Sequence, residues 1–139
     1  MSAAHEVAAF YESYAHAFSA YDAKAVSAHW SFPAVIAGAA RTVTFTADAF
    51  DANTEALFGF YRRQGVARAT AEVLAVDEAF PGVALARVRY RMLDADGGDI
   101  IDFESRYQLR RTKDGWRAAT AIADGELTAW AARGTPLGR

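Results

Sequence analysis

The stretch VALARVRYRMLDADGGDIIDFESRYQLRR, residues 83–111, contains two long segments in which apolar and polar residues alternate. In residues 83–93 three arginines alternate with small or apolar side chains, and in residues 99–111 aromatic and aliphatic side chains alternate with charged ones. Successive side chains of a strand point to opposite faces of a sheet, so each segment predicts a strand with one apolar and one charged face. The aspartates and glycines between the two segments predict a connecting loop.

The flanking sequence extends this pattern on both sides. Residues 68–80 predict a strand that ends at the Pro-Gly pair 81–82, and residues 116–123 predict a last strand after the Asp-Gly pair 114–115. An Asp-Gly pair between alternating segments is a strong hairpin signal. The second half of the chain therefore predicts an antiparallel meander.

The first half of the chain predicts helices. A stripe of apolar residues spaced three and four apart predicts the first helix and comprises Val7, Tyr11, Tyr14, Phe18 and Tyr21. Asp22 is a suitable N-cap for a second helix over residues 23–30, which Pro33 ends. Thr46 is a suitable cap for a third helix that stops before Gly65.

Two shorter features complete the order of elements. Residues 34–45 predict a small hairpin around Gly38, and residues 125–133 predict a short C-terminal helix. Helices grouped on one face of an antiparallel sheet make an α+β domain. We therefore expect one domain over residues 1–139, with three N-terminal helices packed on a strongly curved, mixed but mainly antiparallel sheet that forms a cone-shaped α+β barrel.

Composition excludes several classes of protein. With 53% hydrophobic and 23% charged residues the chain is not disordered, and a net charge of −2 gives no electrostatic case for binding nucleic acid or an anionic membrane. There is no cysteine, and His5, His16 and His29 lack metal-binding spacing, so we expect no metal. No glycine-rich phosphate loop follows a strand, so we expect no cofactor. No membrane span or basic-then-apolar leader is present, and the expectation is a cytoplasmic protein.

Three stretches carry a family resemblance. They are residues 10–14 (FYESY) with Phe18 and Asp22, residues 28–33 (AHWSFP), and residues 114–117 (DGWR). With the order of elements, they resemble the nuclear transport factor 2-like superfamily, which includes ketosteroid isomerase and the SnoaL-like polyketide cyclases. The resemblance covers nearly the whole chain and implies a cavity between sheet and helices. It does not define the function, because this fold hosts enzymes, carriers and dimerising adaptors alike.

Tyr14 is the first candidate site residue. It falls where ketosteroid isomerase-like members place a tyrosine that donates a hydrogen bond to a substrate oxyanion. The alternative is a core tyrosine bonded to a backbone carbonyl or to water. The resemblance also implies a carboxylate base at the position of Gly38 and a second acid near Ser105, which argues against the steroid isomerase mechanism in this chain.

His29 and Asp124 are the other candidates for acid–base chemistry. His29 and Trp30 stand where the superfamily has a leucine–aromatic pair that lines the cavity, and histidine is a natural acid–base group. The alternative for His29 is a contact with the last carbonyls of its helix. Simple alternation from Trp116 turns Asp124 inward, and some SnoaL-like cyclases use an aspartate on their last strand; the alternative for Asp124 is a helix N-cap.

The charged face of the predicted sheet carries an array of arginines. Arg87, Arg89 and Arg91 alternate along one strand, opposite Glu104 and Arg106 of the next. An anion site is one interpretation, and a lattice of cross-strand ion pairs is the other. In related folds this outer face is often the dimer interface, so we expect a homodimer through it.

Two functions from different classes are consistent with these features. The first is a small-molecule pocket protein, either an isomerase, a dehydratase or a cyclase without cofactor, acting on a mostly apolar oxygenated compound. The second is a non-catalytic dimeric module for ligand binding or an accessory role. The predicted pocket is mostly aromatic with a few polar groups and comprises Tyr14, Phe18, His29, Trp30, Phe58, Phe103, Ser105 and Thr120.

Overall fold

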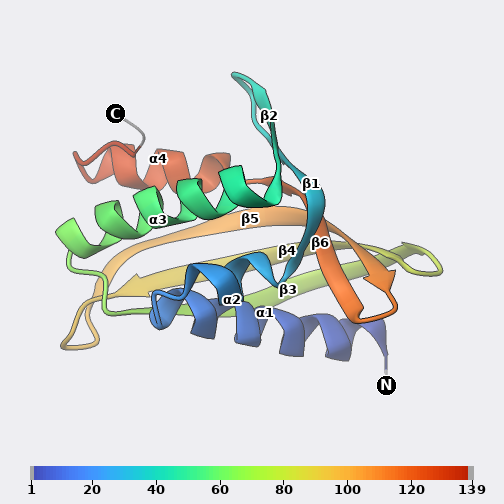
Figure 1. Ribbon diagram of the computed structural model, residues 1–139. Helices are drawn as coiled ribbons and strands as arrows, with labels where there is room; N and C mark the ends of the chain where they lie inside the picture. Colours follow the sequence, from blue (N-terminus) through green and yellow to red (C-terminus); the bar gives the residue numbers. More distant parts are fainter. Residues whose placement is uncertain (1, 138–139) are drawn as a thin grey trace.

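The computed structural model describes residues 2–137 and confirms the α+β class (Figure 1). The elements follow in the order α1 (Ala3–Ser19), α2 (Ala23–Ser27), β1 (Trp30–Ala37), β2 (Thr42–Phe45), α3 (Ala47–Arg63), β3 (Arg68–Phe80), β4 (Val83–Leu93), β5 (Asp99–Thr112), β6 (Gly115–Ile122) and α4 (Asp124–Ala132).

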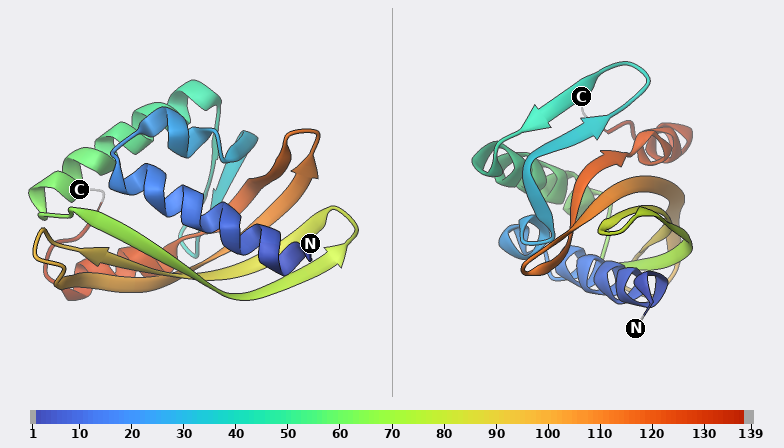
Figure 2. Two further views of the ribbon diagram at one scale, coloured as in Figure 1. Left: turned by 90° about the horizontal axis from the view of Figure 1, so that it is seen from below. Right: turned by 90° about the vertical axis from the view of Figure 1, so that its right-hand side faces the viewer.

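The six strands form one mixed sheet in the order β2-β1-β6-β5-β4-β3. Strands β3 to β6 make the predicted antiparallel meander, and β1 pairs with β2 as the predicted hairpin. Strand β1 pairs in parallel with β6, which joins the two halves of the chain. The sheet curves strongly but does not close, because β2 and β3 remain at its edges (Figure 2).

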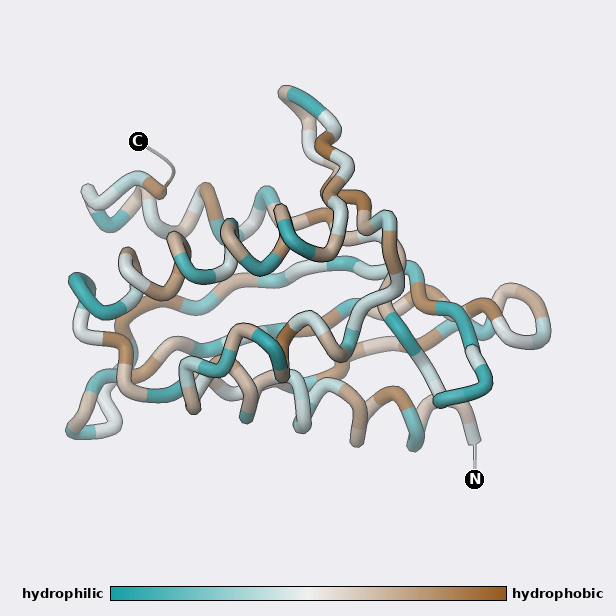
Figure 3. The backbone as a smooth tube through the Cα atoms, in the orientation of Figure 1, coloured by the Kyte–Doolittle hydropathy of each residue, from teal (hydrophilic) through white to brown (hydrophobic). Residues whose placement is uncertain are grey.

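The helices cover the concave side of the sheet. Helix α1 packs along β3, α2 packs against α1 and α3, and α4 packs along β5 (Figures 1 and 2). Polar and apolar residues alternate along the helices and strands instead of forming blocks (Figure 3). No helix within residues 2–137 combines the length and the apolar character that crossing a bilayer requires.

The local signals at the helix ends act as predicted. The side chain of Asp22 accepts a hydrogen bond from the Ala25 amide at 3.1 Å, and Thr46 accepts one from the Ala49 amide at 3.3 Å. Gly65 follows α3 with φ of 79°, a conformation that costs glycine least. These caps satisfy amide groups that have no partner inside their helices.

The second helix is shorter than predicted. It ends at Ser27, and Trp30 already belongs to β1. Pro33 lies inside this strand and not at the end of a helix. Its missing N–H cannot take part in the ladder, and the register between β1 and β6 shifts between Trp30 and Val35.

Strand β5 confirms the predicted alternation, but β6 does not keep it. Gln108 pairs with Thr120 while Leu109 pairs with Ala118, so Ala119 is an extra residue that forms a β-bulge. Beyond the bulge Ala121 is buried. Thr120 therefore does not share the face of the residues before the bulge, and its predicted inward orientation is wrong.

The charged face of the sheet carries the predicted lattice of ion pairs. Arg89 reaches Asp102 at 2.5 Å, Arg91 reaches Asp99 at 2.7 Å, and Arg87 lies 3.8 Å from Glu104. These side chains are largely exposed, so each pair contributes little to stability. The lattice nevertheless places both signs of charge on one outer face.

Two glycines offer a matched test of the packing around α4. A Cβ on Gly125 would lie 2.4 Å from the carbonyl oxygen of Glu104, whereas a Cβ on Gly59 in α3 would lie 3.5 Å from its nearest neighbour, an arginine tip. We expect Gly125→Ala to destabilise the fold by about 1–3 kcal/mol because strand β5 must move. Gly59→Ala should stabilise it by about 0.5–1 kcal/mol because alanine favours helices. Urea denaturation measures both, and equal effects would contradict the contact.

Candidate functional site

A cavity of about 820 Å³ lies between the concave face of the sheet and the helices. A curved sheet cannot contact straight helices along its whole width, which leaves this space. Its wall is largely apolar and contains many aromatic side chains, and it includes the following residues among others: Tyr14, Phe18, Trp30, Phe50, Phe60, Tyr61, Tyr90, Phe103, Ser105, Tyr107, Asp124 and Glu126.

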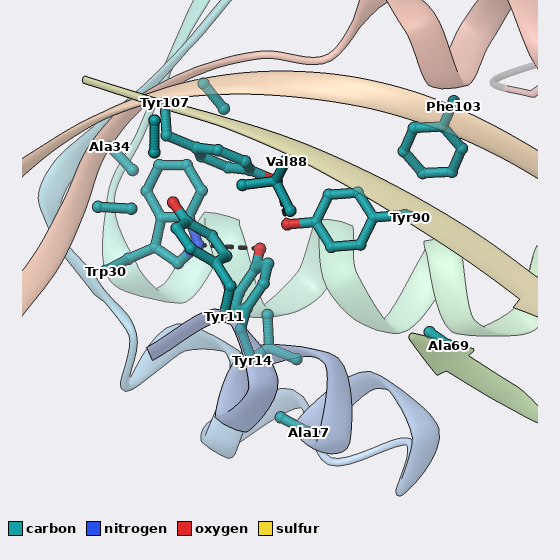
Figure 4. Packing of buried hydrophobic residues seen from close by; sticks show 14 of the residues in the cluster. Tyr11, Tyr14, Ala17, Trp30, Ala34, Ala69, Val88, Tyr90, Phe103 and Tyr107 are labelled. Atoms are coloured by element: carbon teal, nitrogen blue, oxygen red, sulfur yellow. Dashed lines mark hydrogen bonds between the residues drawn. The ribbon is translucent and has the colours of Figure 1, made fainter. Parts of the chain in front are cut away.

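Four tyrosines pack together at one side of this space, and we call Tyr11, Tyr14, Tyr90 and Tyr107 the tyrosine cluster (Figure 4). The rings of Tyr11 and Tyr107 lie 4.8 Å apart, and the hydroxyls of Tyr90 and Tyr107 are hydrogen-bonded at 2.6 Å. Burial raises the pKa of all four phenols. The cluster is therefore neutral and acts through O–H donors and acceptors, not through charge.

The hydroxyl of Tyr14 retains a proton for donation. It accepts a hydrogen bond from the indole N–H of Trp30 at 3.1 Å (Figure 4). Its own proton has no acceptor within residues 2–137, and the side chain lines the cavity. A buried phenol needs a partner, so this proton is available to an acceptor placed in the cavity.

Glu126 is a cavity residue that sequence reasoning missed. Its Oε2 accepts a hydrogen bond from the hydroxyl of Tyr61 and another, at 3.1 Å, from the indole N–H of Trp130. Burial raises the pKa of the Glu126 carboxyl, although these two hydrogen bonds oppose the shift. The available signal was the four-residue spacing of Glu126 and Trp130, which places both on one helix face.

Asp124 joins the cavity to the β1–β2 hairpin. Its Oδ2 accepts a hydrogen bond from the Ala39 amide at 2.9 Å, and a Cβ on Gly38 would lie only 2.7 Å from Oδ1. The carboxylate of Asp124 thus occupies space that a side chain at position 38 would need. The N-cap interpretation is wrong, because Asp124 is the first residue of α4 and the Ala123 cap has no side-chain hydrogen bond.

The cavity brings together five of the eight predicted pocket residues, and candidate Asp124 with them. They are Tyr14, Phe18, Trp30, Phe103 and Ser105. Phe103 and Ser105 share a face of β5, as their alternation predicts, and Tyr14 and Phe18 share a face of α1.

The other three predicted pocket residues do not line the cavity. The ring of His29 faces Phe10 and its Nδ1 donates to the Ala25 carbonyl at 2.7 Å, which is the helix-end alternative. Burial lowers the pKa of His29. Phe58 is fully buried and packs against Phe18. Thr120 lies beyond the bulge, where its hydroxyl donates to Gln108 at 3.3 Å.

The side chains of residues 2–137 do not assemble a metal site. No group of three histidine, aspartate or glutamate side chains in this part of the chain lies close enough to hold an ion. The polar groups in the cavity wall are phenols, hydroxyls, amides, two carboxyls and the guanidinium groups of Arg41 and Arg63. The phenols and hydroxyls can donate and accept hydrogen bonds, and the carboxyls can also exchange protons.

The NTF2-like protein family DUF6841 matches residues 5–126. The chain belongs to this family. No curated protein matches it. A ketosteroid isomerase-like protein from Erwinia carotovora atroseptica has a similar structure, with a TM-score of 0.65, 20% identity, and coverage of 85% of this chain and 92% of the other.

Two further solved structures share this architecture. A cystatin-like domain of unknown function from Nostoc punctiforme has a TM-score of 0.70, 18% identity, and coverage of 88% of this chain and 77% of the other. An NTF2-like protein from Novosphingobium aromaticivorans has a TM-score of 0.65, 21% identity, and coverage of 92% of this chain and 86% of the other. At these identities the likeness establishes the fold, and the NTF2-like fold commonly holds small molecules in its cavity.

The raised pKa of the half-buried Glu126 carboxyl predicts a pH-dependent stability difference. The folded-state pKa lies above the value of 4.5 for an unperturbed glutamate, so ionisation of Glu126 costs folding free energy at neutral pH. Glu126→Gln keeps a neutral acceptor for Tyr61 and Trp130. We expect the variant to melt at a higher temperature than wild type near neutral pH, and the gap to vanish as the pH falls below 4.5.

Differential scanning calorimetry across this pH range measures the gap. Glu12→Gln, at an exposed position of α1, is the matched control and should follow wild type at every pH. A variant of Glu126 that is less stable than wild type at neutral pH would contradict the burial cost.

Proposed function

We propose that this protein binds a mostly apolar, oxygenated small molecule in the cavity and acts on it without a cofactor. The observation that supports this best is the Tyr14 hydroxyl, which lines an aromatic cavity and holds a proton with no acceptor in the described part of the chain. A carbonyl or hydroxyl oxygen of a ligand would accept it. Small-ligand sites are built in this way, from apolar walls and a few converging polar groups.

The remaining polar groups restrict the ligand further. Ser105 is 3% exposed and lies on the same face of β5 as Tyr107, near the tyrosine cluster. Burying a ligand against these aromatic walls removes apolar surface from water, at about 25 cal/mol per Å². Arg41 and Arg63 line the cavity from exposed positions, whereas the Tyr14 phenol and the Ser105 hydroxyl are buried and uncharged. A charged compound placed against Tyr14 and Ser105 would lose its hydration without gaining an ion pair there, so a mostly apolar compound with one oxygen fits this part of the cavity best.

The reaction class follows from the same groups. Isomerisation, dehydration and cyclisation each move a proton at an oxygen or at a carbon near one, and phenols and carboxyls can do this without a cofactor. Gly38 has no side chain, and the carboxylate of Asp124 occupies the space beside it. A non-catalytic binding module would use the same cavity and bind without turnover.

A pair of matched probes tests the binding step. The ketone 2-acetylnaphthalene carries one oxygen acceptor, and 2-ethylnaphthalene has nearly the same shape without it. We expect Tyr14→Phe to weaken binding of the ketone by about 0.5–1.5 kcal/mol, the net value of one hydrogen bond, and to leave the hydrocarbon unchanged. Isothermal titration calorimetry measures both. Equal losses for the two probes would show that Tyr14 only packs, and absence of binding for both would refute the pocket.

We also propose that the protein forms a homodimer through the outer sheet face. Leu85 and Ile122 are exposed on this face to 47% and 48%, beside a shallow hollow over β3 to β6. The ion-pair lattice of the same face carries both signs of charge, so a second copy related by a twofold axis can be complementary to it.

Charge reversal tests this interface. Arg89→Glu turns a positive charge of this face into a negative one beside Asp102, which removes the charge complementarity to a second copy and should shift the protein from dimer to monomer at micromolar concentration. Lys113→Glu, in the exposed β5–β6 turn, makes the same charge change away from the face and should have no effect. Sedimentation velocity distinguishes the two states, and a monomeric wild-type protein would refute the proposal.

A further inference from the structure

The carboxyl group of Glu126 is held in one orientation. Tyr61 of α3 and Trp130 of α4 both donate to its Oε2, and both of these side chains are buried in the core. Their rings lie 6.1 Å apart, and Trp130 also packs edge-on against Phe60 at 5.0 Å. Rotation of the carboxyl would break both hydrogen bonds, so its two oxygens have different roles.

The other oxygen, Oε1, is the one available to a ligand. It has no hydrogen bond within residues 2–137, and Glu126 lies in the cavity wall. Because Oε2 already accepts two hydrogen bonds, a proton bound by Glu126 belongs on Oε1. A ligand in the cavity therefore meets either a carboxylic O–H or a carboxylate lone pair at the same place.

The surroundings favour proton exchange at this oxygen. The groups that face Glu126 are neutral phenols: Tyr61 of α3, Tyr14 of α1 and Tyr107 of β5. The Glu126 charge contributes to the raised pKa of each of them. Asp124 begins the same helix, and Arg41 and Arg63 reach the cavity from exposed positions. Burial leaves the carboxylate poorly solvated, and a poorly solvated carboxylate is a stronger base than a free one.

We propose that Glu126 is the catalytic residue that removes a proton from carbon in this cavity, through Oε1, and that the substrate class is an apolar compound with an oxygen leaving group next to that carbon. This inference rests on the proposed function, because it needs a cavity that admits an apolar molecule. It goes beyond that function by naming the proton-transfer residue and an elimination as the reaction.

The step balances without any further reactant. Oε1 takes the proton, the electron pair of the C–H bond forms the new π bond, and the bond from the neighbouring atom to oxygen breaks. The departing oxygen keeps that electron pair and accepts the hydrogen bond of Tyr14. The proton then passes from Glu126 to this oxygen, so the net change is loss of water or an alcohol and the carboxylate is restored.

Asp124 is the competing base, and its geometry is less suited to this role. Both carboxyls keep one oxygen without a hydrogen-bond partner in the described part of the chain, but Oδ1 of Asp124 lies against the backbone of Gly38 in the β1–β2 hairpin. The free oxygen of Glu126 belongs to a carboxyl that two buried side chains, Tyr61 and Trp130, hold in place. The experiment separates the two carboxyls by isosteric amides at each position.

The probe is 5-nitrobenzisoxazole, a flat, mostly apolar compound that a base opens by removing its C–H proton. The C–H electron pair completes a nitrile, the N–O bond breaks, and a coloured phenolate forms. We expect wild-type protein to open it faster than acetate at equal concentration, and Glu126→Gln to lower that rate by about 100-fold or more. Glu12→Gln should keep the wild-type rate, and Asp124→Asn should lower it less than Glu126→Gln does.

A pH profile separates a chemical role from a structural one. The rate should rise with ionisation of Glu126, at a pH above the 4.5 of a free glutamate. Tyr61→Phe removes a hydrogen bond that favours the carboxylate, so it should move the midpoint of the profile to higher pH. A structural contact alone would lower the rate at all pH values without moving the midpoint.

The outcomes distinguish this inference from the proposed function. If Glu126→Gln binds 2-acetylnaphthalene as wild type does but no longer opens 5-nitrobenzisoxazole, the proposed function and the role of Glu126 are both supported. If wild type binds the ketone yet opens the probe no faster than acetate, or if only Asp124→Asn abolishes the reaction, the role of Glu126 is refuted and the binding pocket remains. If wild type neither binds the ketone nor opens the probe, the proposed function fails as well.

Discussion

The parallel pairing of β1 with β6 is the contact on which the rest of the structure depends. These are the first and the last strand in the sequence, and their ladder joins the helical first half to the meander of the second. The ladder pairs Trp30 with Ala118, and it thereby places the Trp30 indole within hydrogen-bond reach of Tyr14 in the tyrosine cluster. Helix α3 contacts the sheet at β1 and β2, so this pairing holds α3 over the meander, while α1 packs on β3 directly.

The cavity follows from curvature, and its chemistry follows from the residues at its wall. Aromatic side chains line the concave face without filling it, and buried polar groups such as Ser105 and the Tyr14 hydroxyl lie among them. In that environment phenols stay protonated and a carboxyl holds its proton to a higher pH. The two effects act in the same direction, because burial disfavours the charged form of both kinds of group.

On the outer face of the sheet the side chains are exposed to solvent, so charged groups are favoured there. Its arginines and acids are solvated and paired across strands, and they protect the exposed backbone surface without building a site. One strand, β5, serves both purposes, because its alternating side chains belong to the cavity on one side and to the lattice on the other. Membership of the NTF2-like family accounts for this architecture, while the function depends on the few side chains that the cavity brings together.

The sequence by itself determined the features that repeat locally. Alternation in residues 83–111 predicted two strands and their faces, including the inward position of Ser105, and Asp22, Thr46 and Gly65 marked the helix ends. These signals depend on residues that are close in the sequence, so they can be recognised without knowledge of the tertiary structure. The inward face of Tyr14 is of the same kind, because helical spacing alone places it on the stripe of α1.

The tertiary structure alone decided what depends on register and on distant partners. One extra residue at Ala119 reversed the faces beyond it and took Thr120 out of the cavity, and no local pattern reports such a bulge. His29 turned to the Ala25 carbonyl because Trp30 had already entered β1. Glu126 became a cavity carboxyl only through Tyr61, 65 residues away, and that contact exists because α3 and α4 meet across the curved sheet.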